Sequence, residues 1–82
     1  MKVTLKLYAS LSDHLPDERS GNQVDLDVPT GATPLQILEQ HGVPFSQVHL
    51  VLVNGIFIPP SERGKALAAG DHLAVWPAVA GG

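Results

Sequence analysis

The chain has no cysteine among its 82 residues. Disulfides, thiolate nucleophiles and thiolate metal sites are therefore excluded. Any sulfur chemistry in which this protein takes part must proceed without a thiol of its own. The four histidines, His14, His41, His49 and His72, are scattered, and none stands four residues from another as helical metal ligands do. We therefore expect them to be surface and capping residues, and we expect no metal site.

Basic residues are also scarce. The chain has five lysines and arginines and eight acidic residues, so its net charge is −3. The basic residues form no run. This composition argues against binding to nucleic acid or to an anionic membrane surface. No apolar run has the length of a membrane span, and the opening Met1-Lys2-Val3-Thr4 lacks the apolar core of a signal peptide. A cytoplasmic protein is the expectation.

Motifs of self-contained catalysis are missing as well. Neither G-x-G-x-x-G nor G-x-x-x-x-G-K occurs, and no serine lies in a G-x-S-x-G pattern. A chain of this length fits one small domain and leaves little room for a deep pocket. We expect a protein that is not an enzyme on its own.

What the chain does contain is a series of short alternating or β-branched segments. Val3, Leu5 and Leu7 alternate with polar residues, as a half-buried strand requires. Asn54-Gly55 is a strong hairpin signal, and Pro59-Pro60 confines the strand before it to a sheet edge. A helical turn near Leu11 is expected in the connection after the first strand. The predicted strands are residues 2–7, 23–28, 49–53, 56–58 and 72–76.

One helix is predicted over residues 34–41. Thr33 and Gln36 form a capping box around Pro34, and Gly42 suits the position after the helix end. His41, when protonated, would interact favourably with the C-terminal end of this helix. A further helical turn is expected at Ala66–Ala69.

The order ββαβββ favours an α+β fold in which the helix packs on one face of the sheet. If the last strand lies parallel to the first, the mixed sheet is a β-grasp, the architecture of ubiquitin. We predict a β-grasp domain over residues 1–77 and a flexible tail over residues 78–82.

The tail ends in Gly81-Gly82, a thread without side chains that can enter a narrow active site. Alone, this ending is equally compatible with a frayed terminus or a cloning remnant. Four segments make a function for this ending more specific. They are Asn54-Gly55, Gly70-Asp71, the opening Leu7-Tyr8-Ala9-Ser10-Leu11 and the full ending Trp76-Pro77-Ala78-Val79-Ala80-Gly81-Gly82. Together they resemble the ThiS/MoaD family of ubiquitin-like sulfur carriers. The ending looks most like the small subunit of molybdopterin synthase.

The resemblance implies a function for the tail. A ubiquitin-activating-type enzyme would use ATP to adenylate Gly82, and a sulfur donor would convert it to a thiocarboxylate that supplies sulfur for molybdopterin. Val79, Ala80 and Gly81 would enter the active sites of partners, such as the large subunit of molybdopterin synthase. No cofactor would be bound by the chain itself. Thiamine or another sulfur-containing metabolite is an alternative product. Two other hypotheses are a protein modifier that is joined to lysines through Gly82, and a binding domain with an inert tail.

Strand parity makes Trp76 a candidate docking residue. If Leu73 and Val75 point into the core, Trp76 points out at the root of the tail, next to Pro77. Trp is enriched at interface hot spots, so Trp76 and Pro77 are predicted to dock the partners. The alternative is that Trp76 covers the open sheet face or packs on Phe57.

Two further groups of residues each allow two interpretations from the sequence. Val51, Val53 and Ile56 would form either an exposed apolar face or part of the core. Asp25, Asp27 and Asp71 would form either an acidic steering surface or simply a solvated face.

Overall fold

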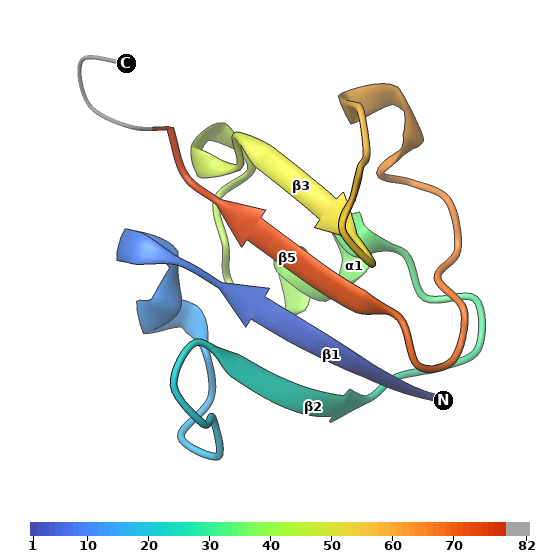
Figure 1. Ribbon diagram of the computed structural model, residues 1–82, viewed down its shortest axis with the longest axis horizontal. Helices are drawn as coiled ribbons and strands as arrows, with labels where there is room; N and C mark the ends of the chain where they lie inside the picture. Colours follow the sequence, from blue (N-terminus) through green and yellow to red (C-terminus); the bar gives the residue numbers. More distant parts are fainter. Residues whose placement is uncertain (79–82) are drawn as a thin grey trace.

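A mixed five-stranded sheet with a helix packed behind it forms the body of the protein (Figure 1). The computed structural model describes residues 1–78, so Val79, Ala80, Gly81 and Gly82 lie outside the described residues. The strands follow the order β2-β1-β5-β3-β4 across the sheet. The elements are β1 (Lys2–Leu7), η1 (Ala9–His14), β2 (Gln23–Asp27), α1 (Pro34–Gln40), η2 (Phe45–Gln47), β3 (Leu50–Val53), β4 (Ile56–Phe57), η3 (Pro60–Glu62) and β5 (His72–Trp76), where η marks a 3₁₀ turn.

The first and last strands lie side by side in the middle of the sheet and run parallel. Leu5 pairs with Leu73, and Leu7 pairs with Val75. β2 joins the other side of β1 antiparallel, and β3 joins the other side of β5 antiparallel. The predicted β-grasp is therefore confirmed. Because β5 is a central strand, the chain leaves it between β1 and β3 and not at a sheet edge.

The two faces of the sheet have different roles. One face packs against α1, where Ile37 and Leu38 are buried. The other face is not covered by a helix and is turned to the viewer in Figure 1; we call it the open face. The core residues from the strands are Val3, Leu5, Leu7, Val24, Val51, Leu73 and Val75.

Of Val51, Val53 and Ile56, which were considered for an exposed apolar face, two are part of the core or pack against it. Val51 is fully buried, and Val53 packs against the core cluster, so only Ile56 is well exposed. The reason is register, because Val51 pairs with Val75 and therefore shares its inward orientation. Leu50 and Leu52 alternate with these valines and lie on the open face instead.

Helix α1 begins and ends where its capping residues require. The Gln36 amide donates to Thr33 Oγ1 at 3.2 Å, and Gln36 Oε1 accepts from the Thr33 amide at 3.0 Å. Gly42 has φ +71°, a conformation that glycine adopts without a steric penalty. His41 is the C-cap residue, and its Nδ1 lies 2.9 Å from the Ile37 carbonyl oxygen. The helix thus ends at Gln40, one residue before the predicted end.

The hairpin between β3 and β4 is tied to the start of β5. Asn54 and Gly55 both have positive φ, at 52° and 80°, as a two-residue hairpin turn needs. Asn54 Nδ2 donates to Asp71 Oδ1 at 2.9 Å, and the Ala68 amide donates to Asp71 Oδ2 at 2.7 Å. Asp71 is therefore a structural residue of this junction.

The three aspartates do not form one acidic surface. Asp25 accepts a hydrogen bond from Thr4 Oγ1 at 2.8 Å, and Asp27 lies 3.5 Å from Lys2 Nζ. Both are on β2, at the sheet edge opposite the hairpin that Asp71 holds.

Replacing Asp71 by Ala is expected to lower the free energy of unfolding by about 2 kcal/mol, because two hydrogen bonds to a carboxylate are lost. Asp27→Ala is the matched control. Its ion pair is exposed, so we expect a change of roughly 0.5 kcal/mol or less. Urea unfolding followed by circular dichroism measures both. Equal losses in the two variants would contradict this role of Asp71.

The predicted helical turn at Ala66–Ala69 is wrong. The Leu67 amide donates to the Ala32 carbonyl at 2.8 Å, and the Ala68 amide donates to the Asp71 side chain. These amides are thus taken up by other segments and cannot close a helical turn. The 3₁₀ turn η3 forms earlier, where Pro60 occupies its first position.

Candidate functional site

Trp76 lies on the open face at the end of β5, where the tail begins. It pairs with Leu50 across the β3–β5 ladder and is half-buried. Its ring stacks on that of Tyr8, with the ring centroids 4.4 Å apart and an angle of 7° between the planes. The partner of Trp76 is therefore Tyr8, directly after β1, and not the Phe57 that was considered from the sequence.

An apolar hollow of about 440 Å³ opens beside this aromatic pair. Its lining comes from the ends of three neighbouring segments, so the fold and not a single loop creates it. The lining residues are Ala9, Ser10, His49, Leu50, Trp76, Pro77 and Ala78. The structure thus brings the two predicted docking residues, Trp76 and Pro77, together in one hollow. The described chain ends on its rim, at Ala78.

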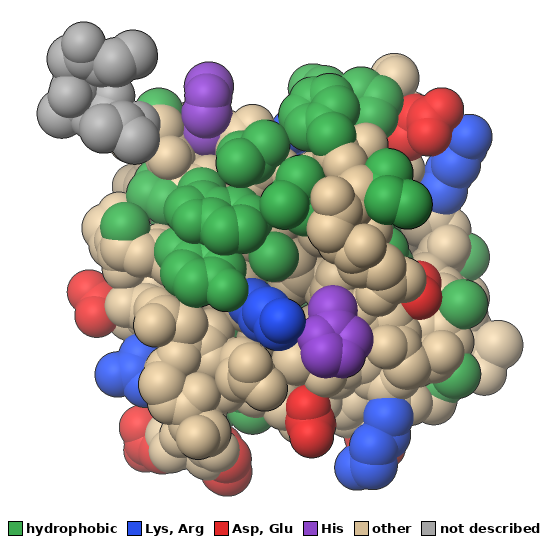
Figure 2. Space-filling view, viewed as in Figure 1, with side chains coloured by type: hydrophobic (Ala, Val, Ile, Leu, Met, Phe, Trp, Pro, Cys, Tyr) green, Lys and Arg blue, Asp and Glu red, His purple; other side chains and the backbone are tan. Residues whose placement is uncertain are grey.

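The apolar surface continues from the hollow across the open face. Figure 2 shows hydrophobic side chains gathered over the ends of β1 and β5 and over β3. Leu50, Leu52 and Phe57 contribute to this surface by their register, and Phe57 is 55% exposed. We call the surface formed by Tyr8, Leu50, Leu52, Phe57 and Trp76 the apolar patch. Exposed apolar patches of this kind mark interaction sites.

Backbone hydrogen bonds fix the point where the tail leaves the sheet. The Tyr8 amide donates to the Val75 carbonyl at 3.1 Å, and the His49 amide donates to the Trp76 carbonyl at 3.0 Å. The last two peptide groups before Pro77 are thus each held, the first from the β1 side and the second from the β3 side. The direction of the chain at Pro77 is consequently set by β1 and β3.

A buried arginine supports this arrangement. Arg63 is only 7% exposed, and its guanidinium donates to the carbonyl of His49 at 3.2 Å and to that of Ile58 at 3.3 Å. The His49 carbonyl therefore accepts from Arg63, while the His49 amide donates to the Trp76 carbonyl. Arg63 was not predicted as a buried residue, because it stands in a polar stretch, Ser61-Glu62-Arg63-Gly64, that is typical of an exposed loop.

Replacing Arg63 by Met is expected to loosen the tail root selectively. Loss of the bond to the His49 carbonyl should speed hydrogen exchange at the His49 amide about tenfold, the factor that corresponds to about 1.4 kcal/mol. The Asn54 amide, which donates to the His72 carbonyl at the other end of the same ladder, is the internal control. Equal acceleration at both amides, measured by NMR, would show that Arg63 merely stabilises the whole domain.

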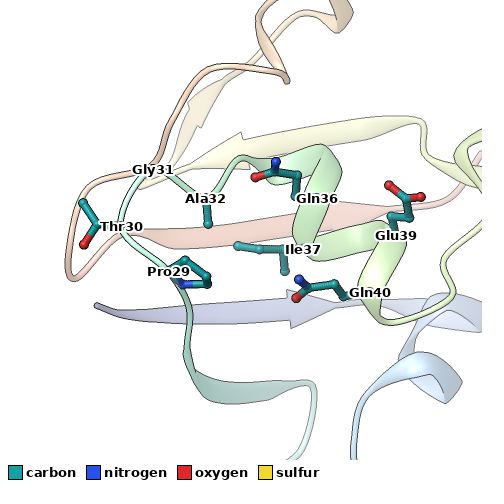
Figure 3. Close-up of a pocket in the computed structure, with 8 residues that line it drawn as sticks. All are labelled: Pro29, Thr30, Gly31, Ala32, Gln36, Ile37, Glu39 and Gln40. Atoms are coloured by element: carbon teal, nitrogen blue, oxygen red, sulfur yellow. The ribbon is translucent and has the colours of Figure 1, made fainter.

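A second hollow lies on the helical side of the molecule (Figure 3). It has a volume of about 330 Å³ between the segment 29–32 and α1, and its lining residues are Pro29, Thr30, Gly31, Ala32, Gln36, Ile37, Glu39 and Gln40. Glu39 is the single titratable side chain in this lining, so the hollow offers no acid–base pair. Within residues 1–78, no group of three or more His, Asp or Glu side chains is placed to hold a metal ion. Nor does any helix in that range have the length and apolarity to cross a membrane.

Comparison with known proteins places these features in a family. The family model described as Mut7-C ubiquitin matches residues 1–81. Comparison with curated protein sequences gives no match.

Three solved structures are similar to the chain over nearly its whole length. SAMP1 from Haloferax volcanii has a TM-score of 0.69 and 27% identity, and 100% of both chains is covered. A second structure, of H. volcanii small archaeal modifier protein 1, has a TM-score of 0.66 and 26% identity, with 95% and 98% of the two chains covered. The putative molybdopterin converting factor, subunit 1, from Pyrococcus furiosus has a TM-score of 0.67, with 95% and 98% covered; at 20% identity this likeness shows the fold alone.

These matches agree with the resemblance to the ubiquitin-like ThiS/MoaD proteins that the ending and the hairpin indicate. The family model covers the β-grasp domain and the segment that follows it up to Gly81. The chain therefore belongs to the Mut7-C ubiquitin family.

Proposed function

We propose that this protein is a ubiquitin-like sulfur carrier whose reactive group is the carboxylate of Gly82. The observation that carries the proposal is the exit of the chain from β5. The last described residues, Pro77 and Ala78, lie on the rim of an apolar hollow beside Trp76. A partner that binds the open face would thus lie close to the start of the tail. Similarity to SAMP1 over the full length of both chains supports this type of function.

In the proposed reaction, the carboxylate of Gly82 attacks the α-phosphate of ATP in the active site of a ubiquitin-activating-type enzyme. An acyl-adenylate forms and pyrophosphate leaves. Hydrosulfide, or an equivalent from a sulfur donor, then attacks the carbonyl carbon, and AMP leaves. The product is a thiocarboxylate on Gly82. The chain supplies the carboxylate and the docking surface, and the partners supply the catalytic groups.

The tail sequence suits this role by what it lacks. Val79, Ala80, Gly81 and Gly82 carry small or no side chains, so they fit a narrow channel. No cysteine is needed, because the sulfur is held on the chain terminus. We propose molybdopterin as the destination of the sulfur, on the likeness of the ending to the small subunit of molybdopterin synthase. Thiamine or another sulfur-containing metabolite is the alternative destination.

Adenylation is the step to test first. The full chain is incubated with ATP and the ubiquitin-activating-type enzyme of the same organism, and pyrophosphate release is measured. The proposal requires release that depends on the chain and stops when Gly82 is blocked as an amide. Release that is indifferent to the chain would refute it.

A second candidate function is modification of other proteins. It is favoured by the likeness to H. volcanii small archaeal modifier protein 1. The same adenylate would then react with a lysine amine, and an isopeptide bond would replace the thiocarboxylate. Cell extracts probed with an antibody to the chain distinguish the two functions. Higher-mass adducts with Gly82 joined to lysine support modification, and only the free chain supports sulfur carriage alone.

A further inference from the structure

Lys6 is the lysine of the open face that has no acidic partner within residues 1–78. Lys2 lies 3.5 Å from Asp27 and Lys65 lies 3.2 Å from Glu62, so the other two lysines are paired. Lys6 is also half-buried, whereas the side chains of Lys2 and Lys65 are each 72% exposed. The ammonium group of Lys6 is therefore free to bind a carboxylate from outside the described domain.

The strand register explains why Lys6 is unpaired. Lys6 lies opposite Gln23 on β2 and opposite Ala74 on β5. The acidic residues of β2 are two and four pairs further along, where Asp25 is bonded to Thr4 and Asp27 to Lys2. A neutral amide and a methyl group are the cross-strand neighbours of Lys6. Its aliphatic stem suits such a surface, with the charged end directed to solvent.

The position of Lys6 joins it to the apolar patch. Tyr8 follows two residues later on the same side of the chain, about 7 Å along the strand. Ala74, the neighbour of Lys6 on β5, is buried, and it is followed at the same spacing by Trp76, which belongs to the patch. Figure 2 shows a basic and a histidine side chain bordering the hydrophobic surface. Lys6 thus brings a positive charge close to the patch, although the chain as a whole has a net charge of −3.

We propose that the open face docks a partner surface that is apolar in its centre and carries an Asp or Glu carboxylate opposite Lys6. The inference rests on the proposed function, in which that partner is the activating enzyme. An apolar partner would remove water from Lys6, and a desolvated ammonium is costly unless a carboxylate pairs with it. A partner without the carboxylate is thereby rejected, so Lys6 contributes specificity as well as attraction.

A second copy of this chain fits the face less well. The acidic residues that another copy would bring on its own open face are Asp25 and Asp27, which are already bonded to Thr4 and Lys2. An isologous contact would also place two Lys6 side chains on the same interface. Charge complementarity thus favours a different, acidic partner.

Charge reversal at Lys6 tests the proposal, with Lys2→Glu as the matched control on the same strand and the same face. Binding of each full-length variant to the ubiquitin-activating-type enzyme is measured by calorimetric titration. We expect Kd to rise about 10-fold for Lys6→Gln and about 100-fold for Lys6→Glu, since each leaves a buried carboxylate unpaired or repelled. Lys6→Arg should stay within about threefold of the wild type, as should Lys2→Glu, because exposed ion pairs contribute little. Thermal unfolding verifies that each variant is folded, and Lys6→Gln serves if Lys6→Glu is not.

Three outcomes would overturn the proposal: wild-type affinity in both Lys6→Gln and Lys6→Glu, no binding by the wild type, or a wild-type dimer in light scattering that Lys6→Glu dissociates. Adenylation of Gly82 is measured in the same samples. If Lys6 variants bind normally and Gly82 is adenylated, the docking inference fails and the proposed function stands. If binding depends on Lys6 but Gly82 is never adenylated, the proposed function fails and the docking inference stands.

Discussion

Deleting Gly82 is expected to abolish thiocarboxylate formation and to leave the stability of the domain unchanged. The deletion shortens the tail by about 3.5 Å, the span of one extended residue. Misplacement of a reacting group by about 1 Å can already cost about 100-fold in rate, so a carboxylate withdrawn by a whole residue should not react measurably. The rate is measured by quenched-flow mass spectrometry with the activating enzyme, ATP and a sulfur donor.

A length series provides the controls for this deletion. Adding a third glycine after Gly82 displaces the carboxylate in the other direction and should also suppress the reaction. Thermal unfolding should be the same in all three chains, because the hydrogen bonds of the tail root involve residues before Pro77. Efficient reaction of the shortened chain would mean that Gly82 is not the group that is activated.

Replacing Trp76 by Ala is expected to weaken binding to the activating enzyme about 30-fold. Hot-spot aromatic residues contribute about 2 kcal/mol or more at interfaces, which corresponds to this factor. From the sequence we expect almost no effect on stability. The stack on Tyr8 revises this expectation, because a stacked aromatic pair contributes about 1 kcal/mol to folding.

Phe45→Ala is the control for Trp76→Ala. Phe45 is 51% exposed but does not line the hollow, so removing its ring should leave affinity nearly unchanged. Calorimetric titration gives the affinities, and urea unfolding gives the stabilities. A large loss of stability with wild-type affinity in Trp76→Ala would assign the ring to folding alone.

Elements whose signals are local were predictable from the sequence. The alternation in residues 2–7 and the capping box at Thr33 and Gln36 need only neighbouring residues, and both are found as predicted. The Asn54-Gly55 turn is of the same kind. The parallel pairing of β1 with β5 was inferred only as a condition, because two segments about 70 residues apart carry no local sign of their register.

Features that depend on distant partners were not predictable. The amides of Leu67 and Ala68 bond to Ala32 and Asp71, which removes the expected helical turn. Arg63 is buried because the carbonyls of His49 and Ile58 converge on it, and nothing near Arg63 in the sequence announces them.

The candidate site shows the same division. Strand parity was enough to place Trp76 on the open face, and the structure places it there beside Pro77. Tyr8 and His49 were not recognised, since Tyr8 reaches the Trp76 ring, and His49 reaches the hollow, from distant parts of the sequence. The unpaired state of Lys6 is likewise a consequence of register, which sets Gln23 and not an aspartate opposite it.

The most direct test of a sulfur carrier uses the absence of cysteine. After incubation with ATP, the activating enzyme and a sulfur donor, the chain is treated with iodoacetamide and its intact mass is measured. With no thiol in the chain, a thiocarboxylate is the expected site of rapid alkylation, and the alkyl group also separates this product from oxidation of Met1. We expect one ATP-dependent alkylation, mapped to Gly82. As a control, the same enzyme is given a carrier protein that it is known to convert. If that carrier is alkylated and this chain is not, the proposal that the chain is a sulfur carrier is contradicted.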